Sequence, residues 1–119
     1  MDFTIYDRMV LSTFTSLEKQ SLYQLLCGAM IVDGNRDSRE ISIINEVNQV
    51  VHITVADVEA SRKLTEPVIS NCIREMDDLK KAYVAKFLAQ VVLADGNVTQ
   101  KEEKFFYYMM DYLNLPVMD

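Results

Sequence analysis

The sequence predicts an all-α fold: one helical bundle of about six to seven helices over residues 1–119, with two pseudo-symmetric helix-turn-helix hairpins. Half of the 119 residues are apolar, and only three Gly and two Pro interrupt the chain. This composition favours a single helical core over disorder or a loop-rich β architecture. A helix-capping pattern recurs along the chain and one turn motif occurs twice, which indicates helices joined by short turns.

The first hairpin begins with a capping box formed by Thr15 and Glu18, in which each side chain accepts a hydrogen bond from the backbone of the other residue. The apolar residues that follow keep helical spacing. Gly34 is expected to adopt the left-handed conformation that ends this helix. A second box over residues 37–40 opens the next helix, which is expected to end near His52.

Two shorter helices are expected between the hairpins. Thr54 and Asp57 cap one that ends near Leu64. Residues 65–67, Thr-Glu-Pro, start the other, because proline is well tolerated in the first turn of a helix.

The second hairpin is predicted to begin at Asp77 or Asp78, which cap a long helix that ends at a second Asp-Gly-Asn turn. A further capping box over residues 99–102 opens the last helix, and Leu115 and Pro116 end it. The two hairpins match over roughly thirty residues each, so an internal pseudo-two-fold symmetry is expected.

Four other residues are assigned structural roles. Gly28 interrupts a helix, which indicates the close approach of another helix. Cys27 and Cys72 show no metal-binding or redox spacing and fall within apolar helical patterns, so reduced core thiols are expected. His52 is expected to be a surface residue stabilised by a helix C-terminus, rather than a metal ligand.

The duplicated turn carries the candidate site. At an offset of 62 positions, Asp33, Gly34, Asn35 and Glu40 fall on Asp95, Gly96, Asn97 and Glu102. Asp33 and Asp95 continue the core-facing stripes of their helices, so both carboxylates are expected to point inward. A buried unpaired charge is destabilising by several kcal/mol, so each carboxylate needs hydrogen bonds, a proton or a cation.

Two interpretations of these acids are open. Asp33, Glu40, Asp95 and Glu102 could supply oxygen ligands to a hard divalent metal ion such as Ca²⁺ or Mg²⁺. Alternatively, the four carboxylates only cap helices and accept hydrogen bonds from backbone N–H groups. An EF-hand is excluded, because the loop positions that require Gly and Glu hold other residues. Counted from each aspartate, these are Ser38 and Ile44 in the first copy and Gln100 and Phe106 in the second.

The double Asp-Gly motif, followed in each copy by a Glu that opens an apolar helix, resembles the TerB-like family associated with tellurite resistance. The motif residues are Asp33, Gly34 and Glu40, then Asp95, Gly96 and Glu102, and the likeness covers about residues 15 to 116. The resemblance implies a helical module with acidic sites suspected of binding metal ions, in a stress or tellurite-resistance context. It implies no enzymatic activity, and the chain carries no nucleophile signature, phosphate loop or cofactor fingerprint.

Six consecutive apolar residues, from Phe105 to Met110, cannot all face one core from a helix. Two explanations are open: the N-terminal segment 2–14 packs over the outer face of this helix, or Phe106, Tyr107 and Met110 form an interface with a protein partner or a second copy.

Net charge and hydropathy limit the kinds of partner and the cellular compartment that can be expected for this protein. The net charge of −6 and the absence of a basic stripe argue against a nucleic-acid partner. No apolar run approaches the roughly 20 residues of a transmembrane helix. The N-terminus lacks a basic secretion region, so a cytoplasmic protein is expected.

Overall fold

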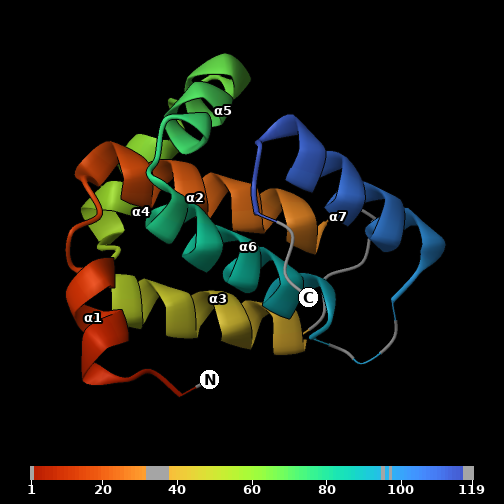
Figure 1. Ribbon diagram of the computed structural model, residues 1–119, viewed down its shortest axis with the longest axis horizontal. Helices are drawn as coiled ribbons and strands as arrows, with labels where there is room; N and C mark the ends of the chain where they lie inside the picture. Colours follow the sequence, from red (N-terminus) through yellow and green to blue (C-terminus); the bar gives the residue numbers. More distant parts are fainter. Residues whose placement is uncertain (1, 32–37, 95, 97, 117–119) are drawn as a thin grey trace.

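The computed structural model describes residues 2–31, 38–94, 96 and 98–116, which contain seven α-helices and no strand (Figure 1). The prediction of an all-α bundle of six to seven helices is confirmed. The helices are α1 (Ile5–Leu11), α2 (Ser16–Met30), α3 (Ser38–Val51), α4 (Val55–Ser61), α5 (Glu66–Arg74), α6 (Asp78–Val92) and α7 (Gln100–Tyr112). None of the helices in the described ranges is long and apolar enough to cross a membrane.

Capping residues fix most of the helix starts. Capping boxes open four helices, with Thr4, Thr15, Thr54 and Thr99 as the N-cap residues of α1, α2, α4 and α7. Each box satisfies backbone N–H groups that have no partner inside the helix. The N-cap of α6 is Asp77, whose carboxylate accepts a 2.8 Å hydrogen bond from the N–H of the third helical residue.

The two hairpins, α2–α3 and α6–α7, end in the same way. His52 follows α3 with a φ of 62°, and Asn114, 62 positions later, follows the last turn of α7 with a φ of 55°. Few non-glycine residues adopt this left-handed conformation, which closes a helix by letting the next N–H reach back to a carbonyl of the last turn. The bonds are Ile53 N–H to Asn48 O at 2.8 Å and Leu115 N–H to Met110 O at 2.9 Å.

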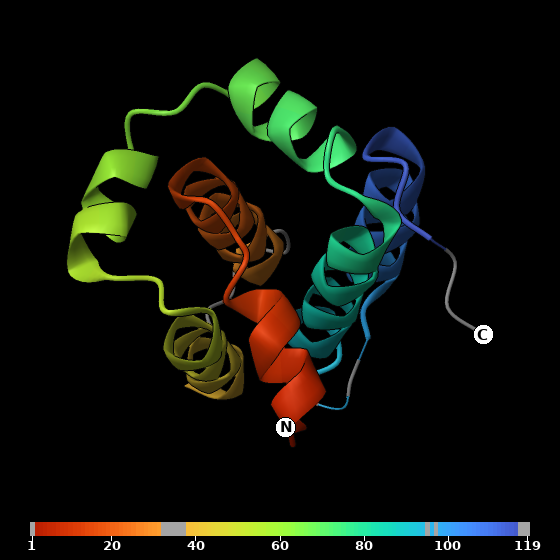
Figure 2. The same cartoon turned by 60° about the vertical axis from the view of Figure 1, so that its left-hand side comes forward.

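Helix α2 occupies the centre of the bundle and contacts α3, α4, α5, α6 and α7 (Figure 2). Its side chains Leu22, Leu26 and Ala29 are completely buried, as are Phe87 and Val91 of α6. The hydrophobic effect therefore holds all of these helices to one shared core.

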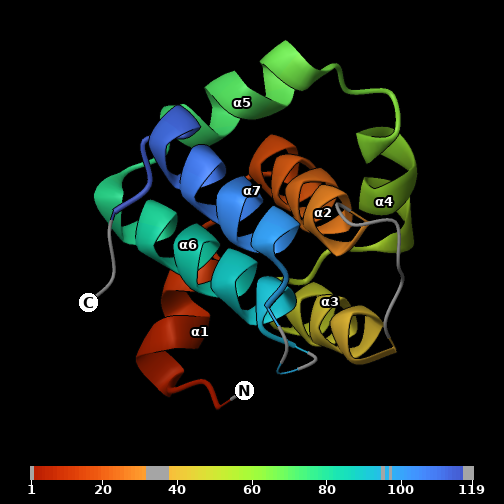
Figure 3. The ribbon, with the colours of Figure 1, turned by 90° about the vertical axis from the view of Figure 1, so that its right-hand side faces the viewer.

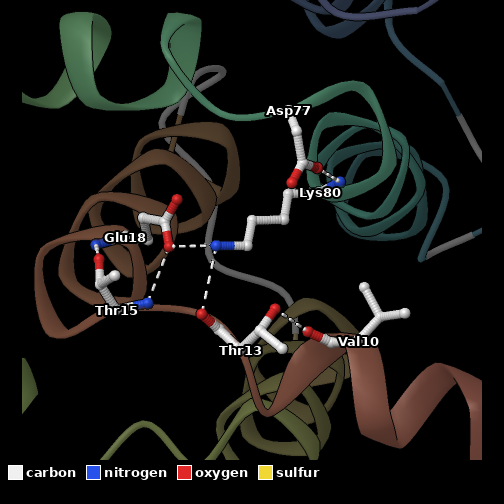
Figure 4. A network of polar contacts seen from close by, with 6 residues as sticks. All are labelled: Val10, Thr13, Thr15, Glu18, Asp77 and Lys80. Carbon is white, nitrogen blue, oxygen red and sulfur yellow. Dashed lines mark hydrogen bonds and ion pairs between the residues drawn. The ribbon is translucent and has the colours of Figure 1, made fainter.

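The N-terminal ends of α2 and α6 are joined by an ion pair (Figure 4). Lys80 Nζ lies 2.8 Å from Glu18 Oε1 and donates a 3.2 Å hydrogen bond to the carbonyl oxygen of Thr13. The same Glu18 oxygen accepts the backbone N–H of Thr15 at 2.8 Å. The side chains of Lys80 and Glu18 are 15% and 13% exposed.

Because α2 and α6 lie side by side with their N-terminal ends together, their C-terminal ends also lie together. Figure 3 shows this end of the bundle, where α3 and α7 begin. The second helices of both hairpins, α3 and α7, therefore begin at the same end of the bundle, on opposite sides of the α2–α6 pair (Figure 2).

The N-terminal segment does not cover α7, and that explanation of the aromatic helix was wrong. It forms α1, which packs against α3 and α6. The ring of Phe3 lies 6.0 Å from that of Phe87, and the Tyr83 hydroxyl donates a 2.5 Å hydrogen bond to Asp7 Oδ1. These contacts bind α1 to the opposite flank of α6.

The expected close helix approach at Gly28 is also absent. A Cβ atom built on Gly28 would meet no heavy atom within 4 Å. Cys27 and Cys72 are not joined in a disulfide, in agreement with the predicted reduced thiols, although both are half-buried rather than fully inside the core.

Candidate functional site

Glu102 lies in the first turn of α7 and is only 3% exposed. Its Oε1 accepts a 3.1 Å hydrogen bond from the N–H of Thr99, and its own N–H donates a 3.1 Å bond to the Thr99 hydroxyl. These are the two contacts of the predicted capping box. The carboxylate stands where the helix dipole favours negative charge.

Glu40 is the third residue of α3 and is 4% exposed. It lies 62 positions before Glu102, so each hairpin buries one carboxylate at the start of its second helix. Glutamate is rarely buried to this extent in proteins, because dehydrating the charge is unfavourable. Burial of both carboxylates at equivalent positions is therefore an unusual shared feature of the two hairpins.

The two aspartates of the predicted site, Asp33 and Asp95, lie outside the described residues, as does Gly34. Gly96, the counterpart of Gly34, is described and has a φ of 74°. Its N–H bonds to the carbonyl of Leu93 at 3.0 Å, which closes the end of α6. The second turn thus contains the left-handed glycine that was expected of the first.

The predicted metal site stays a prediction. Within the part of the chain that the structure describes, no group of three or more His, Cys, Asp and Glu side chains could hold a metal ion. Of the four predicted ligands, only Glu40 and Glu102 belong to that part. Ca²⁺ and Mg²⁺ take about six or more oxygen ligands, so these two carboxylates need the aspartates, backbone oxygens or waters to complete a site.

A groove of about 330 Å³ runs between α6 and α7 beside this end of the bundle. Ala89, Val92 and Leu93 of α6 form one side, and Phe106 and Tyr107 of α7 form the other. Apolar Val98 and the charged Glu103 complete the lining. This groove was not predicted, although the sequence holds a signal for it in Leu93 and Val98, two apolar residues that flank the polar turn.

The three predicted interface residues have different environments. Tyr107 is 65% exposed and Phe106 is half-buried, and both line the groove. Met110 is 8% exposed and belongs to the core, so its predicted place on the outer face was wrong. Met110 and Glu102 are the buried residues of α7. Tyr108, 62% exposed, is the other large side chain on the outer face.

Cys72 does not have the environment of a nucleophile. Burial raises the pKa of Cys72, which disfavours the reactive thiolate. Burial also raises the pKa of Tyr23, and a hydrogen bond with Cys27 adds to the increase.

No protein-family model and no curated protein matches the chain. Among solved structures, the chain is similar to a protein of unknown function from Porphyromonas gingivalis W83, with a TM-score of 0.78 and 20% sequence identity. The similarity covers 99% of this chain and 88% of that one. At this level of identity the likeness extends to the fold alone.

Proposed function

We propose that the protein is a non-enzymatic, TerB-like helical module that binds a divalent cation, Ca²⁺ or Mg²⁺, through its paired acidic turns. Asp33, Glu40, Asp95 and Glu102 are the ligands in this proposal. The module acts in the cytoplasm, in a stress or tellurite-resistance context.

The burial of Glu40 and Glu102 at equivalent positions supports the proposal most strongly. A carboxylate that is already dehydrated and held by a helix start loses little freedom when it coordinates an ion, so binding is less opposed by entropy and desolvation. The side-chain position is fixed at Glu102 by the bonds with Thr99. In this proposal Glu40 and Glu102 each supply one carboxylate from the first turn of a second helix, and Asp33 and Asp95 supply the other two.

The test is a titration of the full chain with CaCl₂ and with MgCl₂ by calorimetry, together with thermal unfolding. At an ion concentration one hundred times the Kd, binding stabilises the native state by about 2.7 kcal/mol, which raises the Tm of a domain of this size by about 10 °C. Absence of both heat and a Tm shift at millimolar ion would refute the proposal.

Two glutamine variants make the titration specific. Glu102→Gln keeps an oxygen that can accept the Thr99 hydrogen bond but removes the charge, so we expect cation affinity to fall by about tenfold or more. Glu103→Gln removes an exposed charge from the next position of the same helix and should leave the affinity nearly unchanged. Equal losses in both variants would indicate a general effect of surface charge.

The groove between α6 and α7 favours a second candidate, a module that binds a protein partner while the acids act only as helix caps. Tyr107, Leu93 and Val98 expose apolar surface around it, at 65%, 56% and 42%. Aromatic residues of this kind are enriched at protein interfaces. In this case no cation binds, Tyr107→Ser weakens capture of the partner, and Glu102→Gln has no effect on capture.

A further inference from the structure

A second cleft lies between α2, α5 and α7, and its floor contains Gly28. Glycine in the interior of a helix is destabilising by about 1 kcal/mol relative to alanine. No neighbouring atom requires a glycine at this position, since an added Cβ would meet nothing within 4 Å. The missing side chain therefore leaves open space above α2.

The cleft has a volume of about 170 Å³ and mostly apolar walls. Leu25 beside Gly28 belongs to the floor, Ile69 to the α5 side, and Phe105 and Met109 to the α7 side. An apolar cavity of about 150 Å³ is sufficient for one benzene ring, whereas pockets for drug-sized ligands and cofactors have about 300 Å³ or more. The cleft thus has room for one aromatic ring.

The polar groups that line the cleft offer acceptors. Glu66 lies at its mouth, where Ser70 and, at 3.0 Å, the Tyr112 hydroxyl both donate to Oε1. Both of these bonds go to Oε1, and among the described residues none donates to Glu66 Oε2. Gln24 uses its amide nitrogen on Ser61 at 2.9 Å, which leaves its carbonyl oxygen as an acceptor. A ligand that hydrogen-bonds to these oxygens in the cleft must therefore carry a hydrogen-bond donor.

The two sides of the cleft are fixed relative to each other. Arg74 of α5 donates a 2.8 Å hydrogen bond from Nε to the carbonyl oxygen of Tyr112, and its guanidinium carbon lies 4.2 Å from the centre of the Tyr112 ring. Together with the bond from Tyr112 to Glu66, these contacts connect both ends of α5 to the C-terminal end of α7. The cleft is therefore formed before any ligand enters, which reduces the entropy lost on binding.

We propose that this cleft binds the side chain of a tyrosine presented by a protein partner, with the ring above Gly28 and the ring hydroxyl donating to Glu66 or Gln24. A protein partner is favoured over a free small molecule, because the space holds a single ring and the mouth, where Glu66 is exposed, leaves the remainder of the ligand in solvent. This site is independent of the acidic turns and of the α6–α7 groove.

The test uses N-acetyl-tyrosinamide and N-acetyl-phenylalaninamide, which differ by one hydroxyl, with the Met109 methyl group as an NMR reporter. We expect saturable shifts of this methyl group with the tyrosine compound and at least about threefold weaker binding of the phenylalanine compound, for loss of one hydrogen bond. Glu66→Ala should remove part of this preference, whereas Tyr112→Phe, which keeps the carboxylate, should retain it.

Gly28→Leu fills the cleft and should abolish the shifts, and the smaller Gly28→Ala should weaken binding. Gln90→Leu is the matched control, since Gln90 lies 62 positions after Gly28 on α6 and should leave binding unchanged. Helical circular dichroism checks that each variant is folded. The proposal is overturned if neither compound shifts Met109, if Gly28→Leu still binds, or if free phenol binds and the two amides do not.

Discussion

The ion pair between Lys80 and Glu18 is predicted to be a major link between the two hairpins. A lysine in the first turn of a helix is normally unfavourable, because it stands at the positive end of the helix dipole. Here it reaches across to the equivalent position of α2 and meets the carboxylate that caps that helix. Replacing Lys80 by methionine keeps the length and apolar stem of the side chain and removes only its charge and its donors.

The loss of stability expected from Lys80→Met follows from two hydrogen bonds. Lys80→Met removes a charge-assisted bond of 2.8 Å to Glu18 and a 3.2 Å bond to the carbonyl of Thr13. Bonds to charged groups contribute about 1.5–3 kcal/mol when buried, and exposed ion pairs less than about 1 kcal/mol. With side chains 13–15% exposed, we expect a loss of about 2 kcal/mol in the free energy of unfolding.

A double-mutant cycle with Glu18→Gln isolates the pair. Glutamine retains an acceptor for the N–H of Thr15, so the cap survives while the charge is removed. We expect a coupling energy of about 1–1.5 kcal/mol between Lys80 and Glu18, measured by urea unfolding followed by circular dichroism. A coupling energy below about 0.3 kcal/mol would show that the pair is a surface contact without energetic weight, and the reasoning would be refuted.

Three further predictions concern stability. His52→Gly should raise the free energy of unfolding by about 1 kcal/mol, since glycine adopts a φ of 62° without strain. Asn114→Gly should raise it by less, because asparagine tolerates this conformation better. Urea unfolding of both variants checks which one gains more stability. Gly28→Ala should also gain about 1 kcal/mol by the same measurement, and a loss would mean that Gly28 is required for packing. The hydrogen bond from Tyr83 lowers the pKa of Asp7, while burial and this bond raise the pKa of Tyr83 to about 12. The bond should therefore stabilise the fold most between about pH 4 and pH 10. Its contribution should weaken as pH falls below the normal carboxyl pKa of 3.8 and as pH rises from about 10 towards 12. Tyr83→Phe should reduce both of these changes in stability with pH.

Helix starts were predictable because a capping box depends on only four consecutive residues. Thr15, Thr54 and Thr99 begin helices as expected, and each accepts the hydrogen bond that its pattern predicts. The box formed by Thr4 and Asp7 has the same pattern, but the N-terminal helix that it opens was not singled out.

Packing was less predictable, because it depends on partners that are distant in sequence. The placement of α1 against α3 and α6 depends on Phe3 reaching Phe87 and on Tyr83 reaching Asp7, and no local pattern contains these pairs. For the candidate site, the duplicated motif located Glu40 and Glu102 but gave no measure of their burial. The groove beside α7 arises only when α6 and α7 are placed side by side.

The central place of α2 has a consequence for the growing chain. Its apolar side chains are synthesised early, yet one of the helices that cover them, α6, extends to residue 92. At about 5–20 residues per second, several seconds separate the two on the ribosome. During that interval the first hairpin exposes an apolar surface, so an isolated fragment ending near residue 53 should aggregate. Nascent chains of this protein should therefore bind ribosome-associated chaperones.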